Sequence, residues 1–129
     1  MVEDDPSRPS GTPTRALRVR IMLEPGTPFG PGKAELLEAI RDTGSIAAAG
    51  RRLGMSYQRA WSLVVAMNAH FRQPVVAAAK GGVRGGGAAL TPLGDEVLAA
   101  YQEIVALAEA ATAKRVRWLR GLMAGRKAD

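Results

Sequence analysis

The chain has 129 residues, with 18 Lys or Arg against 12 Asp or Glu, which fits one small basic domain with a formal net charge of +6. It contains no cysteine and one histidine, His70, which excludes disulfides, thiolate metal sites and most histidine-based metal or catalytic clusters. No apolar run approaches the roughly 20 residues of a membrane span, and the acidic N-terminus lacks the features of a secretory signal. We therefore expect a cytoplasmic, non-enzymatic protein without a metal, a cofactor or a membrane, whose charge suits a polyanionic partner.

The N-terminal part divides into a tail and a strand. Residues 1–14 combine three prolines with small polar and acidic residues, and too little apolar surface to offset the entropy of ordering, so we expect a disordered tail. From 17 to 23 an apolar residue stands at every second position, which predicts a half-buried strand. The Pro- and Gly-rich stretch at 24–32 is expected to end this strand.

Three short helices follow. Apolar spacing predicts them over 33–43, 46–53 and 57–71, with Ser45 and Ser56 as the N-caps of the second and third. Glycines stand directly after the first two, and a proline stops the third.

The third helix has two different faces. At 100° per residue, one face collects the apolar positions that we expect in the core, namely Ala60, Leu63, Val64, Met67 and Phe71. The opposite face is polar or small and contains Gln58, Arg59, Ser62, Ala66 and Ala69. It carries no acidic residue, so a polyanion can approach it closely. Trp61, at the margin, is expected in the core or at a domain seam rather than stacked on a base.

A hairpin is predicted next, with strands at Val75–Lys80 and Ala88–Thr91 around the sequence GGVRGGG. This turn lacks the Lys-Ser/Thr ending of a nucleotide loop and the spacing of the dinucleotide fingerprint. We therefore interpret it as a flexible wing rather than a phosphate-binding loop, with Arg84 at its tip.

Thr91 as N-cap and Pro92 as first residue predict a final helix. If it continues to Ala124 it is roughly 50 Å long, too long to pack entirely on three short helices. Its apolar residues at alternating spacings of four and three, continued by Trp118, predict a dimerisation seam: Val97, Tyr101, Ile104, Ala108 and Ala111. The alternative is that they cover their own domain. The basic amphipathic end of the helix fits dimer packing better than a membrane surface.

The order of these parts predicts a mainly α fold with a small β-sheet, a winged helix-turn-helix followed by a long C-terminal dimerisation helix. In that architecture the first residues of the third helix enter the major groove of DNA, and the wing reaches phosphates or the minor groove.

Two segments also resemble a known family. LLEAIRDTGSIAAAGRRLGMSYQRAWSLVVAMN at 36–68 and GGVRGGGAALTPLGDEVLAAY at 81–101 resemble the N-terminal domain of the ModE-type molybdate-responsive transcription regulators. The specific features are G-S-I before the turn, G-M-S-Y-x-x-A-W after it, M-N at the helix end and a glycine wing ending in L-T. The resemblance implies DNA contacts from Ser45, Ser56, Tyr57, Gln58 and Arg59, and from the wing residues Lys80 and Arg84.

The residue chemistry agrees in part with this resemblance. Gln58 can pair bidentately with adenine, and Arg59 with guanine or a phosphate. Ser62, one turn further along the same face, can add a groove contact, while Arg51 and Arg52 face solvent or phosphate.

We therefore expect a sequence-specific transcription regulator of the ModE/LysR-like winged-helix type that binds double-stranded operator DNA as a homodimer. The expected units are the tail at 1–14, the DNA-binding domain at 15–91 and the dimerisation helix at 92–125. Since no strand-rich segment follows the long helix in this sequence, we expect the family's C-terminal molybdate-binding domain to be missing and a separate sensor protein to be a further partner. The alternative is a non-catalytic interaction module, an adaptor that pairs through its long helix with another subunit.

Overall fold

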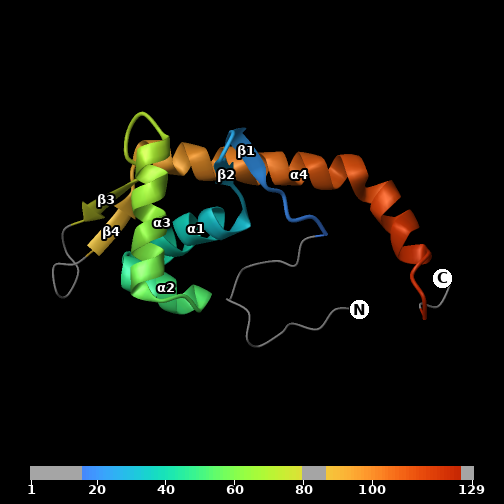
Figure 1. Ribbon diagram of the computed structural model, residues 1–129, viewed down its shortest axis with the longest axis horizontal. Coiled ribbons are helices and arrows are strands. Elements are labelled where there is room, and N and C mark those ends of the chain that lie inside the picture. Colours follow the sequence, from blue (N-terminus) through green and yellow to red (C-terminus); the bar gives the residue numbers. More distant parts are fainter. Residues whose placement is uncertain (1–15, 80–86, 126–129) are drawn as a thin grey trace.

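The computed structural model describes residues 16–79 and 87–125. It is mainly helical, with two small antiparallel sheets, as the sequence predicts. Helices α1 and α2 lie below the N-terminal half of the long helix α4, and α3 crosses in front of them (Figure 1). The elements in chain order are β1 (Ile21–Glu24), β2 (Thr27–Phe29), α1 (Pro31–Thr43), α2 (Ile46–Leu53), α3 (Tyr57–His70), β3 (Val76–Ala79), β4 (Gly87–Leu90) and α4 (Pro92–Gly121).

The first sheet is a hairpin of β1 and β2, which the sequence analysis missed. The apolar alternation predicted one strand over 17–23, and the Pro- and Gly-rich stretch at 24–32 was expected only to end that strand. In the structure this stretch also forms β2, which pairs with β1 so that Ile21 lies opposite Phe29. The register shifts between Met22 and Glu24, and Leu23 is exposed rather than inward. A bulge of this kind breaks the strict alternation of faces, which explains why the predicted period failed there.

The helix boundaries follow the predicted caps closely. The Ser45 Oγ accepts a hydrogen bond from the Ala48 N–H at 2.8 Å, and the Ser56 Oγ accepts one from the Arg59 N–H at 3.1 Å. Gly44 ends α1 with φ of +76°, a left-handed conformation that favours glycine. The first helix begins at Pro31, two residues earlier than predicted, because proline is well suited to a first helical position.

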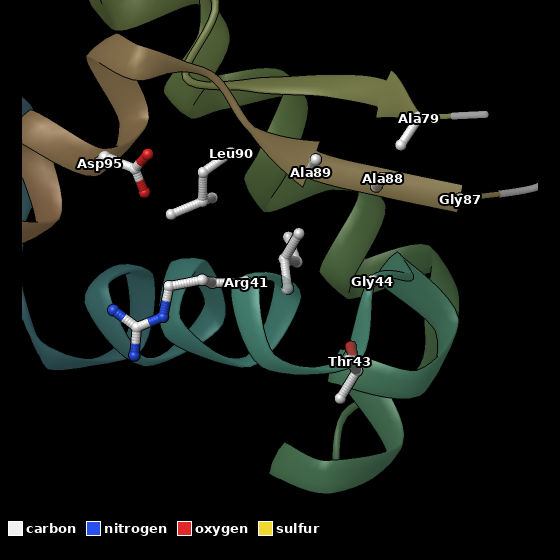
Figure 2. A pocket seen from close by; sticks show the side chains of 10 residues that line it. Arg41, Thr43, Gly44, Ala79, Gly87, Ala88, Ala89, Leu90 and Asp95 are labelled. Atoms are coloured by element: carbon white, nitrogen blue, oxygen red, sulfur yellow. The ribbon is translucent and has the colours of Figure 1, made fainter. Parts of the chain in front are cut away.

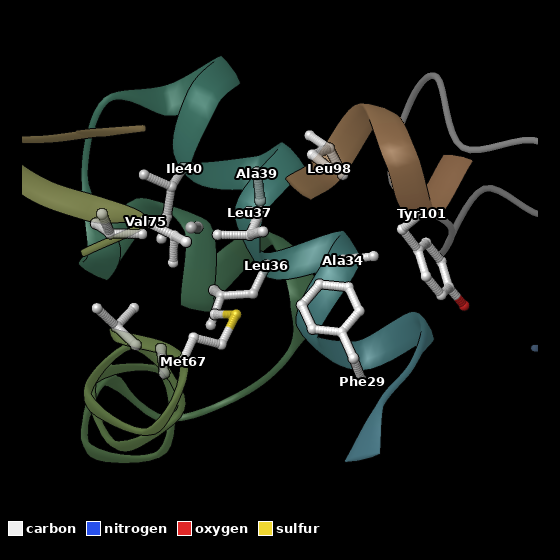
Figure 3. Packing of buried hydrophobic residues seen from close by; sticks show 14 of the residues in the cluster. Phe29, Ala34, Leu36, Leu37, Ala39, Ile40, Met67, Val75, Leu98 and Tyr101 are labelled. Atoms are coloured by element: carbon white, nitrogen blue, oxygen red, sulfur yellow. The ribbon is translucent and has the colours of Figure 1, made fainter. Parts of the chain in front are cut away.

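The core forms where α1 meets α3 and the start of α4 (Figure 3). Its largest fully buried side chains are Leu36, Leu37, Ile40, Met67 and Val75. Phe29 packs edge-on against Phe71 and Tyr101, with ring centroids 6.3 and 5.4 Å apart.

The predicted inward face of α3 is confirmed. Ala60, Val64 and Met67 are buried, and Leu63 and Phe71 are half-buried against the core. Trp61 is different, because 49% of it is exposed and it is not part of the core cluster. Of the two expected positions, the core is therefore wrong, since the position of Trp61 on the helix turns its ring past the edge of the buried face, while the domain seam stays a prediction.

The second sheet pairs β3 with β4 in one antiparallel register, from Val76 opposite Leu90 to Ala79 opposite Gly87. The Asn68 side chain ties the end of α3 to this sheet: its Oδ1 accepts from the N–H groups of Val75 and Val76, and its Nδ2 donates to the Val76 carbonyl. The sheet is therefore held in a fixed position beside α3.

Helix α4 packs on the domain mainly through its first half, and in its second half the Glu109 carboxylate accepts a hydrogen bond from the Leu17 N–H at 2.7 Å. Gly94, Leu98, Tyr101 and Val105 are its buried residues, whereas the later turns run past the domain (Figure 1). It ends at Gly121, slightly before the predicted Ala124. Among the residues that the structure describes, no helix is both long enough and apolar enough to cross a membrane.

Candidate nucleic-acid interface

The turn between α2 and α3 brings these two helices into close contact. Gly50 of α2 is buried, and a Cβ built there would lie 3.3 Å from the Cβ of Ala60 and 3.2 Å from the Met55 carbonyl oxygen. The Met55 N–H also donates to the Gly50 carbonyl at 2.9 Å. The helix-propensity cost of glycine inside α2, about 1 kcal/mol, is therefore offset by this close packing.

The first turns of α3 present the predicted polar residues outward. Gln58, Arg59 and Ser62 are all exposed, and so are Ser56 and Tyr57 just before them. The residues come together because they lie on the side of α3 opposite Ala60 and Val64. The arrangement leaves hydrogen-bonding groups free to reach a surface placed against α3.

Ser45 and Ser56 have similar roles at the N-termini of α2 and α3. Each hydroxyl oxygen accepts a backbone N–H of its own helix, so its hydrogen remains available for donation to another acceptor. Both helix N-termini also carry partial positive charge and free N–H groups, which favour an anion.

The arginines of α2 differ in their surroundings. Both Arg51 and Arg52 are exposed, but the Arg52 Nη1 lies 3.0 Å from the Asp42 Oδ2. The hydrogen bond from Arg52 is the main cause that lowers the pKa of Asp42, with Arg41 adding to the effect. The carboxylate therefore stays ionised and neutralises part of the positive charge beside α2. The sequence analysis did not find this pair, because its two members are ten residues apart on different helices.

The base of the predicted wing lies beside the start of α2. The Ala88 N–H in β4 donates to the Gly44 carbonyl at 2.9 Å, directly before Ser45. The two predicted wing contacts, Lys80 and Arg84, lie outside the described residues.

A groove of about 470 Å³ separates the end of α1 from β4 (Figure 2). Figure 2 shows Arg41 and Asp95 at one end of it and Thr43 with Gly44 at the other. The Thr43 hydroxyl already donates to the Ala39 carbonyl, and the other lining side chains are apolar or absent. Among residues 16–79 and 87–125, no three acidic or histidine side chains are grouped so as to hold a metal ion.

The predicted dimerisation residues of α4 fall into three groups by exposure. Ile104, Ala111 and Trp118 are exposed, while Val97 and Ala108 are half-buried. The prediction that Tyr101 belongs to the dimerisation seam is wrong, because only 7% of this residue is exposed and its hydroxyl donates to the Val19 carbonyl. Its ring lies against Phe29 of its own chain and is not available to a second copy. Exposed Leu107 was missed as a further apolar residue of this helix. Leu119 on α4, and Leu122 and Met123 just after its end, are also exposed and form the apolar side of the predicted amphipathic end.

Together these features define a mainly helical, winged-helix-like domain with a long C-terminal helix. No family model matches the chain. Over 96 residues the chain is 47% identical to the molybdenum-pterin-binding protein MopB of Rhodobacter capsulatus, a match that covers 74% of this chain and 36% of MopB.

Two further relatives carry the name ModE. The chain is 36% identical over 94 residues to the molybdenum transport protein ModE of Azotobacter vinelandii, with 72% of this chain and 35% of the relative covered. It is 37% identical over 71 residues to the DNA-binding transcriptional dual regulator ModE of Escherichia coli, with 55% and 27% covered. The chain thus spans about a third of the length of the curated relatives it matches, and this similarity supports the resemblance drawn from residues 36–68 and 81–101.

Proposed function

We propose that this protein is a sequence-specific regulator of transcription that binds double-stranded DNA through α3. The observation that carries the proposal is the exposed N-terminal part of α3, where Gln58 and Arg59 project from a face without acidic residues. A glutamine can pair bidentately with adenine, and an arginine with guanine, in the major groove. Ser62, one turn along, adds a further polar contact.

Phosphate contacts would set the position of α3 in the groove. The hydroxyls of Ser45 and Ser56 can donate to phosphate oxygens at the two helix N-termini. Arg51, Arg52 and the hydroxyl of Tyr57 supply further contacts. We assign Lys80 and Arg84 to the wing's contact with the backbone or the minor groove.

We also propose that two copies associate through α4. Its exposed apolar residues are too many for a solvated helix surface, and a two-fold axis through this helix would present two copies of α3 to a two-fold operator. The proposed face consists of Ile104, Leu107, Ala108, Ala111, Trp118 and Leu119. Val97 is removed from it because it packs against the core of its own chain. Tyr101 is removed from it for the reason given above.

The names of the relatives suggest the process that is regulated. ModE of Escherichia coli is named a DNA-binding transcriptional dual regulator, and other relatives are named for molybdenum transport or molybdenum-pterin binding. We propose molybdenum-related regulation in the cytoplasm, without enzymatic activity, with a separate sensor protein as a further partner.

Salt dependence tests the DNA-binding proposal. If a dimer neutralises six to ten phosphates, its affinity for duplex DNA falls by about three to five decades between roughly 50 and 200 mM salt. Fluorescence anisotropy with a labelled duplex measures this fall. A flat response would reject the proposal.

A second candidate, an adaptor, is favoured by the same exposed residues of α4 if their partner is another protein. Light scattering on the isolated protein separates the two. A dimer that Leu119→Glu converts to a monomer, while the control Leu23→Glu on β1 does not, supports the homodimer. A monomer that gains mass only with a different protein supports the adaptor.

A further inference from the structure

Helix α3 carries an exposed stripe of large side chains, of which the polar contacts above use only the Tyr57 hydroxyl. Tyr57, Trp61 and Val65 follow one another at intervals of four residues, so they lie along one side of the helix. They are 56, 49 and 45% exposed, and none belongs to the core cluster or packs against it. This stripe, the α3 stripe, borders the face that carries Gln58 and Ser62.

The charges around the α3 stripe indicate what covers it. Helices α2 and α3 contain Arg51, Arg52 and Arg59 and no acidic residue. A second copy of this face would place arginines against arginines, which disfavours self-association here. A polyanion is complementary to the same charges, so the groove of a DNA duplex is the occupant that fits.

We propose that the α3 stripe reads thymine in the major groove, with Trp61 in contact with the 5-methyl group. This inference rests on the DNA-binding function proposed above. An indole has one N–H donor and no acceptor, so it cannot make the bidentate hydrogen bonds by which Gln58 and Arg59 would read purines. The thymine methyl is the apolar group that a base pair presents in this groove, and apolar side chains read it by contact.

The spacing of the residues sets where this thymine lies. Gln58 and Trp61 are three residues apart, about 4.5 Å along the helix axis. Successive base pairs are separated by about 3.4 Å. The thymine therefore lies within one or two base pairs of the pair that Gln58 contacts.

The test removes single methyl groups from DNA. A duplex is first selected from a random pool with the wild-type protein, and each thymine in it is then replaced by deoxyuridine. We expect about a fourfold loss of affinity when the thymine at one or two positions in each half of the operator is replaced. This is the effect of losing one buried methyl group. In Trp61→Ala the same replacements cause no further loss, and Trp61→Phe restores part of the sensitivity. The control Met22→Ala, an exposed apolar residue on β1, keeps the full wild-type response.

Three outcomes overturn the inference. If the wild-type protein is insensitive to every deoxyuridine replacement, its thymine contacts do not exist, and this result needs no variant to fold. If Trp61→Ala remains as sensitive as the wild type, another residue makes the contact. If selection enriches no duplex at all, the proposed function fails, and the inference fails with it.

Discussion

The backbone N–H of Ala88 donates a hydrogen bond to the carbonyl oxygen of Gly44, and this bond joins β4 to the turn that precedes α2. It spans the groove in Figure 2 at its Gly44 end. The neighbouring Gly87 fits there because it has no side chain: a Cβ would lie 2.9 Å from the Ala79 carbonyl oxygen and 3.4 Å from that of Gly44. The base of the wing and the start of α2 are therefore positioned by the same few backbone groups.

Gly87→Ala should weaken DNA binding. The added methyl pushes β4 away from Ala79 and Gly44, at a cost of about 1–3 kcal/mol in stability or in displacement of the wing. The part of this free energy that displaces the wing reduces DNA binding, and we expect a roughly tenfold loss of affinity, measured by fluorescence anisotropy. The control is Gly32→Ala in α1, where a Cβ meets nothing within 4 Å. Equal affinity of the two variants would show that the wing base does not affect binding.

Gly94→Ala should destabilise the fold. Gly94 is buried in the first turn of α4, and a methyl group there would overlap the Val75 carbonyl, which is backbone and cannot turn aside. We expect a loss of at least about 2–3 kcal/mol in the free energy of unfolding. Gly121→Ala, at the other end of the same helix, has open space and should be neutral or slightly stabilising. Urea denaturation of both variants gives the comparison, and similar stabilities would contradict the close approach of α4 to Val75.

Tyr101→Phe should change how stability depends on pH. Burial raises the pKa of Tyr101 above its ordinary value of 10.0, because it disfavours the charged phenolate, and only the neutral hydroxyl can donate to the Val19 carbonyl. The wild type therefore keeps this stabilisation below the unfolded-state pKa and loses it as the pH rises through about 10 and above. The variant lacks the hydrogen bond and should be less stable by about 1 kcal/mol at neutral pH.

The difference between wild type and Tyr101→Phe should then shrink in alkaline solution. Chemical denaturation at about pH 7 and about pH 10.5 measures it on either side of the ordinary tyrosine pKa. Tyr57→Phe, an exposed tyrosine, serves as control and should leave stability unchanged at both. A constant gap between wild type and Tyr101→Phe would argue against the contact with Val19.

Asp42→Asn should strengthen DNA binding. The Asp42 carboxylate lies 3.0 Å from the Arg52 guanidinium and places a negative charge beside α2. Removing that charge frees Arg52 for a phosphate and reduces repulsion, which we expect to raise affinity roughly two- to threefold at low salt. Glu103→Gln on α4 removes an equal charge and should have a smaller effect. If the two substitutions act equally, only net charge matters and Arg52 has no specific contact.

Local chemistry made much of this fold predictable. The caps at Ser45 and Ser56 and the inward face around Ala60 and Met67 depend on residues close together in sequence, and the structure confirms them. Tyr101 was predicted wrongly, because a seven-residue apolar repeat fits a dimer seam and a contact within the same domain equally well. Its contact with the Val19 carbonyl, far away in the sequence, shows that the same-domain contact forms.

Trp61 could not be placed for a related reason. Residue type predicts burial, but its exposure depends on how far the buried face of α3 extends, which is set by α1 and α2. Of the candidate interface, the exposed positions of Gln58, Arg59 and Ser62 followed from helical period alone, whereas the Asp42 to Arg52 pair required the packing of α1 beside α2.

The central claim is that the N-terminal part of α3 reads bases. The most direct measurement is the affinity of wild type and Gln58→Ala for the selected duplex and for each single-base-pair variant of it, with the distal Arg117→Ala as control. We expect Gln58→Ala to lose about 1–3 kcal/mol of discrimination at one A·T pair, while Arg117→Ala keeps the wild-type preference at every position. Unchanged discrimination in Gln58→Ala would contradict the account.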